Sequence, residues 1–180
     1  MNLANKLTVL RMVLVPVFLI CAMLNSVTGN VIAITVFILA SVTDKLDGYI
    51  ARSRNQITNF GKFMDPLADK LLVTTALIIL VEKNIVPAWV VVVIIAREFV
   101  VSGLRTLAAS QGIVIAASNL GKLKTVVQMV GITMALICMV YSPSWLYSIT
   151  QIVIYLAGVI TIFSGIDYFI KGKGIIKINE

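Results

Sequence analysis

The sequence predicts an all-α integral membrane protein with six transmembrane helices. Of its 180 residues, 59% are apolar and only 13% are charged, whereas a soluble domain has about 45–50% apolar and about 25% charged residues. A membrane-spanning helix needs roughly 20 mainly apolar residues, so the chain has room for about six spans with short connections. We therefore expect one membrane domain over residues 1–180 and exclude an ordinary water-soluble globule.

Six apolar segments follow one another along the chain, and each is long enough for a helix. The predicted helices are residues 9–24, 30–50, 64–81, 86–104, 119–140 and 146–170. For the first, Lys6 and Arg11 precede the main apolar stretch as in a signal peptide, but no small-residue cleavage site ends that stretch, so we expect a retained helix. The second and third are joined by residues 52–61, a segment short enough to fold these two helices back against each other.

The last three predicted helices differ in their polar residues. The fourth contains Arg97 and Glu98 within an apolar run, and charges at membrane depth require a reason. The fifth opens with the polar run 119–125, and the sixth leads into a tail with three lysines, over residues 171–177. We expect this tail to fix topology and to contact lipid headgroups.

The positive charges set the expected orientation. With a cytoplasmic N-terminus, 14 of the 15 Lys and Arg residues lie on the cytoplasmic side or within the spans near it, as the positive-inside rule expects. Trp89, Trp145, Tyr141 and Tyr147 then fall at the outer interface as an aromatic belt. Both termini are therefore expected to be cytoplasmic.

The composition also restricts the chemistry. The chain has no histidine, which excludes His-based nucleophilic schemes and leaves oxygen ligands for any metal. Cys21 and Cys138 lie in separate apolar runs and are expected to be packing residues. The net charge of +7 in so hydrophobic a chain favours the anionic leaflet or a phosphorylated substrate, and we expect no nucleic acid partner.

Four aspartates cluster where the second predicted helix ends and the third begins. They are half of the eight acidic residues and lie within 26 residues: Asp44, Asp47, Asp65 and Asp69. Their i, i+3 and i, i+4 spacings place each pair on one helix face. Two such faces turned toward each other would form an oxygen-rich cage for Mg²⁺ or Mn²⁺. The alternative is a set of salt bridges with neighbouring lysines and arginines, or a solvated face.

The aspartates belong to a longer pattern of eight residues with fixed spacing. Its members are Asp44, Asp47, Gly48, Ala51, Arg52, Gly61, Asp65 and Asp69. At every position and spacing this pattern resembles the signature of the CDP-alcohol phosphatidyltransferases. The six-helix layout with both termini inside is similar to that family's membrane domain, so the resemblance covers nearly the whole chain.

The resemblance implies a binuclear site with two divalent cations, Mg or Mn, and a homodimeric protein. Asp44, Asp47 and Asp65 would hold the metals, and Asp69, at the metal edge, would complete the ligand set and act as the base. The expected metal ligands are Asp44, Asp47, Asp65 and Asp69. The residues expected near the nucleotide of a CDP-linked lipid are Gly48, Arg52 and Gly61. This agrees with phosphoryl-transfer chemistry, in which positioning and charge neutralisation dominate.

The acceptor alcohol depends on residues outside the signature. If Arg105, Lys122 and Lys124 converge, the acceptor carries its own phosphate, which favours glycerol 3-phosphate or inositol phosphate over neutral alcohols. Glu98 and Arg105 share one helical stripe with Ser102, and we expect this stripe to face the same cavity as the aspartates. Arg97 or Arg105 could instead simply neutralise Glu98 or the aspartate cluster as a structural ion pair.

Three further stretches resemble the bacterial phosphatidylglycerophosphate synthases within this family: residues 96–105, 121–125 and 5–16. We therefore expect transfer of the phosphatidyl group from CDP-diacylglycerol to sn-glycerol 3-phosphate, giving phosphatidylglycerophosphate and CMP. The site would face the cytoplasm at the cell membrane. The alternatives are the same chemistry with inositol phosphate, a divalent-cation transporter that uses the aspartates as its transport site, and a non-catalytic membrane scaffold.

Overall fold

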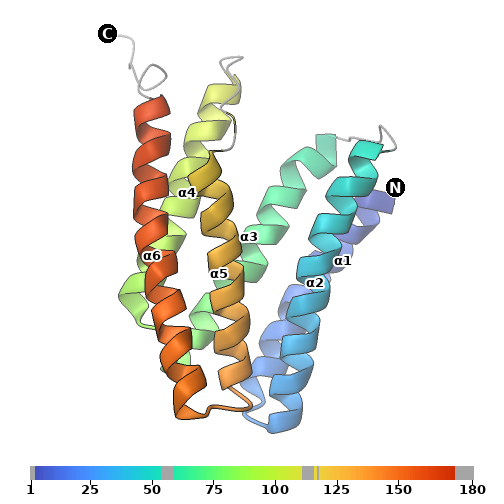
Figure 1. The fold of residues 1–180 in the computed structure, drawn as a ribbon. Coiled ribbons are helices and arrows are strands. Elements are labelled where there is room, and N and C mark those ends of the chain that lie inside the picture. The colour runs from blue at the N-terminus through green and yellow to red at the C-terminus, as the bar shows by residue number, and fades with distance from the viewer. Residues whose placement is uncertain (1–2, 54–58, 111–115, 117, 173–180) are drawn as a thin grey trace. The chain divides into compact units, whose positions relative to one another are not determined.

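The computed structural model describes residues 3–53, 59–110, 116 and 118–172, and these form six helices without a strand (Figure 1). Within the helices, the side chains of residues 3–4, 44–53, 59–63 and 171–172 lie outside the described part. The helices are α1 (Leu3–Met23), α2 (Val27–Ser53), α3 (Asn59–Glu82), α4 (Ala88–Ser110), α5 (Asn119–Cys138) and α6 (Ser144–Gly172). All six predicted helices are confirmed as elements, in the expected order.

The helices are those of an all-α membrane protein. Among the described residues, three helices are long and apolar enough to cross a bilayer: α1 from Asn5, α5, and α6 as far as Ile170. In α2 the described side chains end at Thr43, and the helix is apolar over Val27–Thr43. Large apolar side chains are exposed along the helices, with Ile20 at 62% and Ile152 at 66% exposure. Such a surface is suited to lipid rather than water.

The chain divides into two compact units, and each is described by itself. Unit 1 comprises residues 1–83 and 136–142, and therefore contains α1, α2 and α3. Unit 2 comprises residues 84–135 and 143–180, and therefore contains α4, most of α5, and α6. The prediction of one domain over residues 1–180 stays a prediction.

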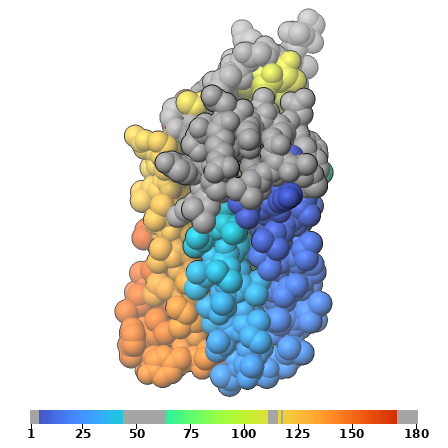
Figure 2. Space-filling model, turned by 90° about the vertical axis from the view of Figure 1, so that its right-hand side faces the viewer, coloured from blue at the N-terminus to red at the C-terminus, as the bar shows by residue number. Residues whose placement is uncertain are grey.

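In unit 1, α1 packs against both α2 and α3. Figures 1 and 2 show α1 and α2 side by side. The rings of Phe18 and Phe37 meet with their centroids 5.8 Å apart, and the small side chains of Ala22, Ala33 and Ala40 are fully buried. Small residues allow helix backbones to approach closely, which is how helices in lipid gain packing energy.

A tight connection joins α1 to α2. The Ser26 hydroxyl accepts a hydrogen bond from the Gly29 N–H at 3.0 Å, which caps the first turn of α2. A Cβ at position 29 would lie only 2.7 Å from the backbone carbonyl oxygen of Cys21. Glycine is therefore required at this close approach, and Asn25 supports the turn by adopting a φ of 51°.

In unit 2, α4 packs against α6. Two glycines of α6 lie along this contact: a Cβ at Gly158 would be 3.3 Å from Val90, and one at Gly165 would be 3.3 Å from the Arg97 side chain. The rings of Trp89 and Tyr155 stack with centroids 5.8 Å apart. The glycine spacing therefore lets α4 approach α6 closely at the level of Arg97.

Candidate active site

The structure places the aspartate signature at the ends of two helices of unit 1. Asp44 and Asp47 lie near the C-terminal end of α2, and Asp65 and Asp69 lie in the first half of α3. The backbone is helical through both pairs, and α2 contacts α3. The backbone therefore carries the two pairs on helices that contact each other, and the pairing of their side chains stays a prediction.

Several signature side chains lie outside the described residues. The positions concerned are Asp44, Asp47, Gly48, Ala51, Arg52 and Gly61. The backbone places Gly48 and Arg52 in the same end of α2 as the first two aspartates, and Gly61 at the start of α3. Their predicted roles at the metals and the nucleotide stay predictions.

The side chains of Asp65 and Asp69 are described. Asp65 is half-buried, Asp69 is exposed, and one helical turn separates them on α3. Asp65 accepts a hydrogen bond from the Thr8 hydroxyl of α1, with 2.5 Å between Oγ1 and Oδ1. Within the described part of the chain, no three or more His, Cys, Asp or Glu side chains come together in a way that could hold a metal ion. Two carboxylates one turn apart on an accessible face are oxygen donors of the kind that Mg²⁺ and Mn²⁺ prefer.

A buried polar face on α1 lies beside this site. Asn5 is 9% exposed, and Thr8 and Arg11 are fully buried. Their regular spacing of three residues keeps all three on neighbouring positions of one helix face. From the sequence, Asn5 and Thr8 are used only as part of a resemblance and Arg11 also as a positive charge before an apolar stretch, and none is connected with Asp65. Their spacing at the start of an apolar helix is the signal that could have indicated a buried polar face.

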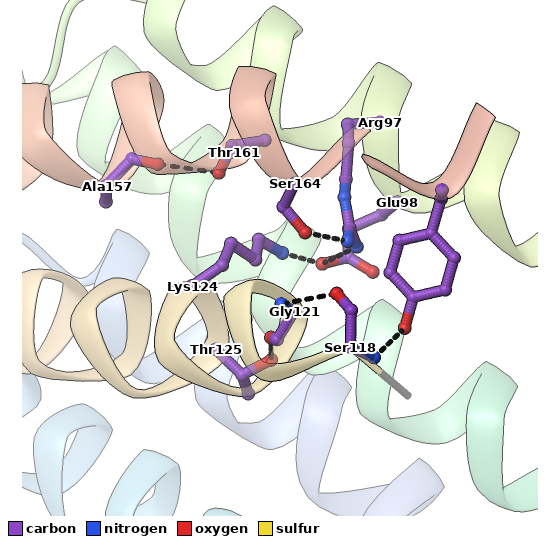
Figure 3. Close-up of polar contacts among 10 residues, drawn as sticks. Arg97, Glu98, Ser118, Gly121, Lys124, Thr125, Ala157, Thr161 and Ser164 are labelled. Carbon is purple, nitrogen blue, oxygen red and sulfur yellow. Dashed lines mark hydrogen bonds and ion pairs between the residues drawn. The ribbon is translucent and has the colours of Figure 1, made fainter. Parts of the chain in front are cut away.

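In unit 2, Glu98 is held between two cations (Figure 3). The Lys124 ammonium of α5 forms an ion pair with the Glu98 carboxylate. The Arg97 guanidinium is also near, with 4.0 Å between Nη1 and Oε1 of Glu98. The Glu98 side chain is 27% exposed, whereas that of Lys124 is 1% exposed. Glu98 is therefore neutralised mainly by Lys124, a partner that the sequence did not indicate.

Arg97 connects α4 to α6. Its Nη2 donates a hydrogen bond to the Ser164 hydroxyl at 2.5 Å, and its guanidinium lies 5.2 Å from the centroid of the Tyr168 ring. A cation over an aromatic face is attracted by the ring quadrupole. These contacts give Arg97 a structural role between α4 and α6, whereas the main ion-pair partner of Glu98 is Lys124 rather than Arg97.

Tyr168 also holds the start of α5. Its hydroxyl accepts a hydrogen bond from the backbone N–H of Ser118 at 3.1 Å. The Ser118 hydroxyl in turn accepts a bond from the Gly121 N–H at 3.0 Å, so Ser118 is the N-cap of α5. Gly121 leaves room for this arrangement, since a Cβ there would lie 3.2 Å from the Tyr168 ring. The N-terminal end of α5, which carries the two lysines, is therefore fixed by α6.

The three residues predicted to bind the acceptor phosphate have different environments. Arg105 and Lys122 are exposed, so both are accessible to an anion. Lys124 is buried and contacts Glu98, so a phosphate at Lys124 would share the ammonium with that carboxylate. The convergence of these residues, and a common cavity with the aspartates, stay predictions.

The sequence matches the CDP-alcohol phosphatidyltransferase family over residues 1–163. The chain therefore belongs to the CDP-alcohol phosphatidyltransferase family, a family of transferase enzymes, and family membership favours the enzyme interpretation over a cation transporter or a scaffold.

Individual relatives agree with this assignment. The chain is 42% identical to the CDP-diacylglycerol–glycerol-3-phosphate 3-phosphatidyltransferase of Bacillus subtilis (strain 168), over 99% of both chains. It is 39% identical to a Rickettsia bellii protein of the same name, over 93% of both chains. A Haemophilus influenzae protein, also of that name, is 37% identical over 96% of this chain and 94% of its own length.

Proposed function

We propose that this chain transfers the phosphatidyl group of CDP-diacylglycerol to sn-glycerol 3-phosphate, giving phosphatidylglycerophosphate and CMP. The observation that carries the proposal is the 42% identity over 99% of both chains to a relative named for this reaction. The aspartate signature at the ends of α2 and α3 supplies the matching chemistry.

Two divalent cations, Mg or Mn, are proposed as cofactors. The residues proposed to hold them are Asp44, Asp47, Asp65 and Asp69. The two aspartates whose side chains are described suit divalent cations, because Asp65 and Asp69 offer carboxylate oxygens one turn apart and at least partly exposed. When bound, such ions neutralise the diphosphate charge and polarise the phosphorus under attack.

Asp69 is proposed as the base. A primary hydroxyl of glycerol 3-phosphate forms a new O–P bond at the lipid-linked phosphorus of CDP-diacylglycerol, and the bond from that phosphorus to the CMP phosphate breaks. The proton of the attacking hydroxyl passes to the Asp69 carboxylate. Asp69 is exposed on α3, as a group that must meet a small hydrophilic substrate should be, and a positioned carboxylate is an ordinary general base.

The other substrate contacts follow from charge. Gly48, Arg52 and Gly61 are proposed to lie near the nucleotide of the CDP-lipid. Arg105 and Lys122 are proposed to bind the phosphate of the acceptor, because both are exposed cations in unit 2. Lys124, at the N-terminal end of α5, would add its charge there together with the free backbone donors of the helix end.

The membrane orientation and assembly belong to the same proposal. The positive-inside distribution of 14 of the 15 Lys and Arg residues supports a site that faces the cytoplasm, with both termini on that side. The family resemblance supports a homodimer. Mass measurement of the protein in detergent, with the detergent contribution subtracted, checks the dimer.

The proposal is tested by offering CDP-diacylglycerol with different acceptors to the purified protein in detergent. Glycerol 3-phosphate should give phosphatidylglycerophosphate and CMP in equal amounts, whereas inositol phosphate and free glycerol should give neither. A lipid product formed faster from inositol phosphate would reassign the acceptor. Absence of CMP release with every acceptor would contradict the transferase proposal itself.

A further inference from the structure

A hydrogen bond between described side chains connects α1 to the aspartate site. Thr8 of α1 donates its hydroxyl hydrogen to Oδ1 of Asp65 on α3, with 2.5 Å between the oxygens. The two residues are 57 positions apart in sequence, and the contact lies wholly within unit 1. A hydroxyl that donates to a carboxylate makes a charge-assisted bond, and such O–H···O⁻ bonds are short and strong.

The environment of Thr8 keeps its hydroxyl in place. Thr8 is fully buried, and it lies in α1 between the buried polar residues Asn5 and Arg11. In a helix threonine has two favoured χ1 rotamers, and the one in this structure directs the hydroxyl to Asp65. Because Thr8 is buried, water does not readily replace this hydrogen bond when it is broken, so breaking it costs free energy.

The bond has a specific consequence for Asp65. An ionised carboxylate has about four lone-pair sites on its two oxygens, and Thr8 uses one of them on Oδ1. The carboxylate is thereby fixed in orientation, while Oδ2 keeps its full capacity to accept a ligand. Partners that hydrogen-bond to a metal-ligating carboxylate typically change metal affinity or activity about 10- to 100-fold when they are mutated.

We propose that Thr8 is a positioning residue that orients the Asp65 carboxylate for binding a divalent cation. This inference rests on the proposed function, because it takes Asp65 to be a metal ligand. A purely structural role for the bond, in which it only joins α1 to α3, is the competing interpretation. The two interpretations differ in what happens to metal affinity when the protein remains folded.

The test measures Mn²⁺ binding to the full-length protein in detergent, with no substrate present. Free Mn²⁺ is counted by electron paramagnetic resonance during a titration, and folding is checked by thermal melting. Thr8→Val keeps the shape of the side chain and removes the donor, whereas Thr8→Ser keeps the donor. The matched control is Thr161→Val, since Thr161 is also fully buried but donates to the Ala157 carbonyl of its own helix at 2.6 Å (Figure 3).

Thr8→Val is expected to weaken Mn²⁺ binding about 10-fold or more, while Thr8→Ser and Thr161→Val bind as the wild type does. If Thr8→Val melts lower but binds Mn²⁺ with unchanged affinity, the bond is only structural and the inference is wrong. The inference is equally wrong if Thr8→Ser binds as weakly as Thr8→Val, because the hydroxyl would then not be the cause.

A double-mutant cycle keeps the test decisive if Thr8→Val folds poorly. In an Asp65→Asn background the residual Mn²⁺ affinity should be the same with Thr8 and with Thr8→Ala, because the proposed effect of Thr8 on the metal passes through the Asp65 carboxylate. A further loss of affinity in the double variant would contradict this. If the wild-type protein binds no Mn²⁺, both the proposed metal site and the inference are wrong. If the wild type binds Mn²⁺ and the Thr8 variants bind it with the same affinity, only the inference is wrong.

Discussion

Replacing Tyr168 by Phe tests how α6 fixes the start of α5. The change removes the Tyr168 hydroxyl, which accepts a 3.1 Å hydrogen bond from the backbone N–H of Ser118. It leaves the aromatic ring under Arg97 in place. Ser118 is 7% exposed, so water has little access to the abandoned donor. A buried donor left without its partner costs about 1–3 kcal/mol.

This cost has a measurable size. For a chain of 150–250 residues, 1 kcal/mol corresponds to about 2–4 °C in Tm, so Tyr168→Phe should lower the Tm in detergent by about 2–12 °C. Because Ser118 also caps the helix that carries Lys122 and Lys124, the KM for glycerol 3-phosphate should rise. Thermal melting followed by intrinsic fluorescence, and steady-state kinetics at saturating CDP-diacylglycerol, measure the two effects.

The matched control is Tyr155→Phe, which makes the same change on the same helix. Tyr155 is 42% exposed and stacks on Trp89 through its ring, which phenylalanine retains. Its free energy of unfolding should stay within about 0.5 kcal/mol of the wild type, as for an ordinary surface change, which is about 1–2 °C in Tm. Equal Tm values for Tyr168→Phe and Tyr155→Phe would refute the reasoning that the Ser118 contact fixes α5.

Three further predictions concern other contacts. In a double-mutant cycle of Glu98→Gln and Lys124→Met, the double variant should lose less free energy of unfolding than the two single variants lose together, by about 0.5–3 kcal/mol. The reason is that each single change leaves the other charge without its ion-pair partner, so additive losses would contradict the pair. Gly29→Ala should lower the Tm, since its Cβ would lie 2.7 Å from the Cys21 carbonyl oxygen; an unchanged Tm would mean that the turn adapts freely. Removing divalent ions with a chelator should stop CMP release, and added Mg²⁺ should restore it; release that persists in the chelator would contradict the proposed cofactor.

The parts of the fold that follow from local composition could be predicted from the sequence. Apolar runs bounded by polar connections predict six helices, and all six are present among the described residues. The start of α1 at Leu3 is earlier than the predicted position 9, because the polar residues Asn5 and Thr8 are helical and buried in protein. Hydropathy assigns such residues to water, and only tertiary packing shows otherwise.

The polar contacts between helices were harder to predict, because each joins residues that are distant in sequence. Glu98 has Arg97 beside it and Arg105 two turns away, yet the structure pairs it with Lys124 of another helix. Thr8 and Asp65 are both recognisable as polar residues near helix ends, but their contact depends on how α1 packs against α3. The spacing of residues within one helix was informative, whereas the choice of partner across helices was not.

The central claim is that an aspartate-held metal site in this chain makes phosphatidylglycerophosphate from CDP-diacylglycerol and glycerol 3-phosphate. The most direct measurement compares Asp47→Asn with Glu82→Gln, which neutralises an exposed carboxylate at the far end of α3. With purified, folded proteins and Mg²⁺ present, Asp47→Asn should abolish formation of the lipid product, and Glu82→Gln should leave it at the wild-type rate. Full activity in Asp47→Asn would contradict the account.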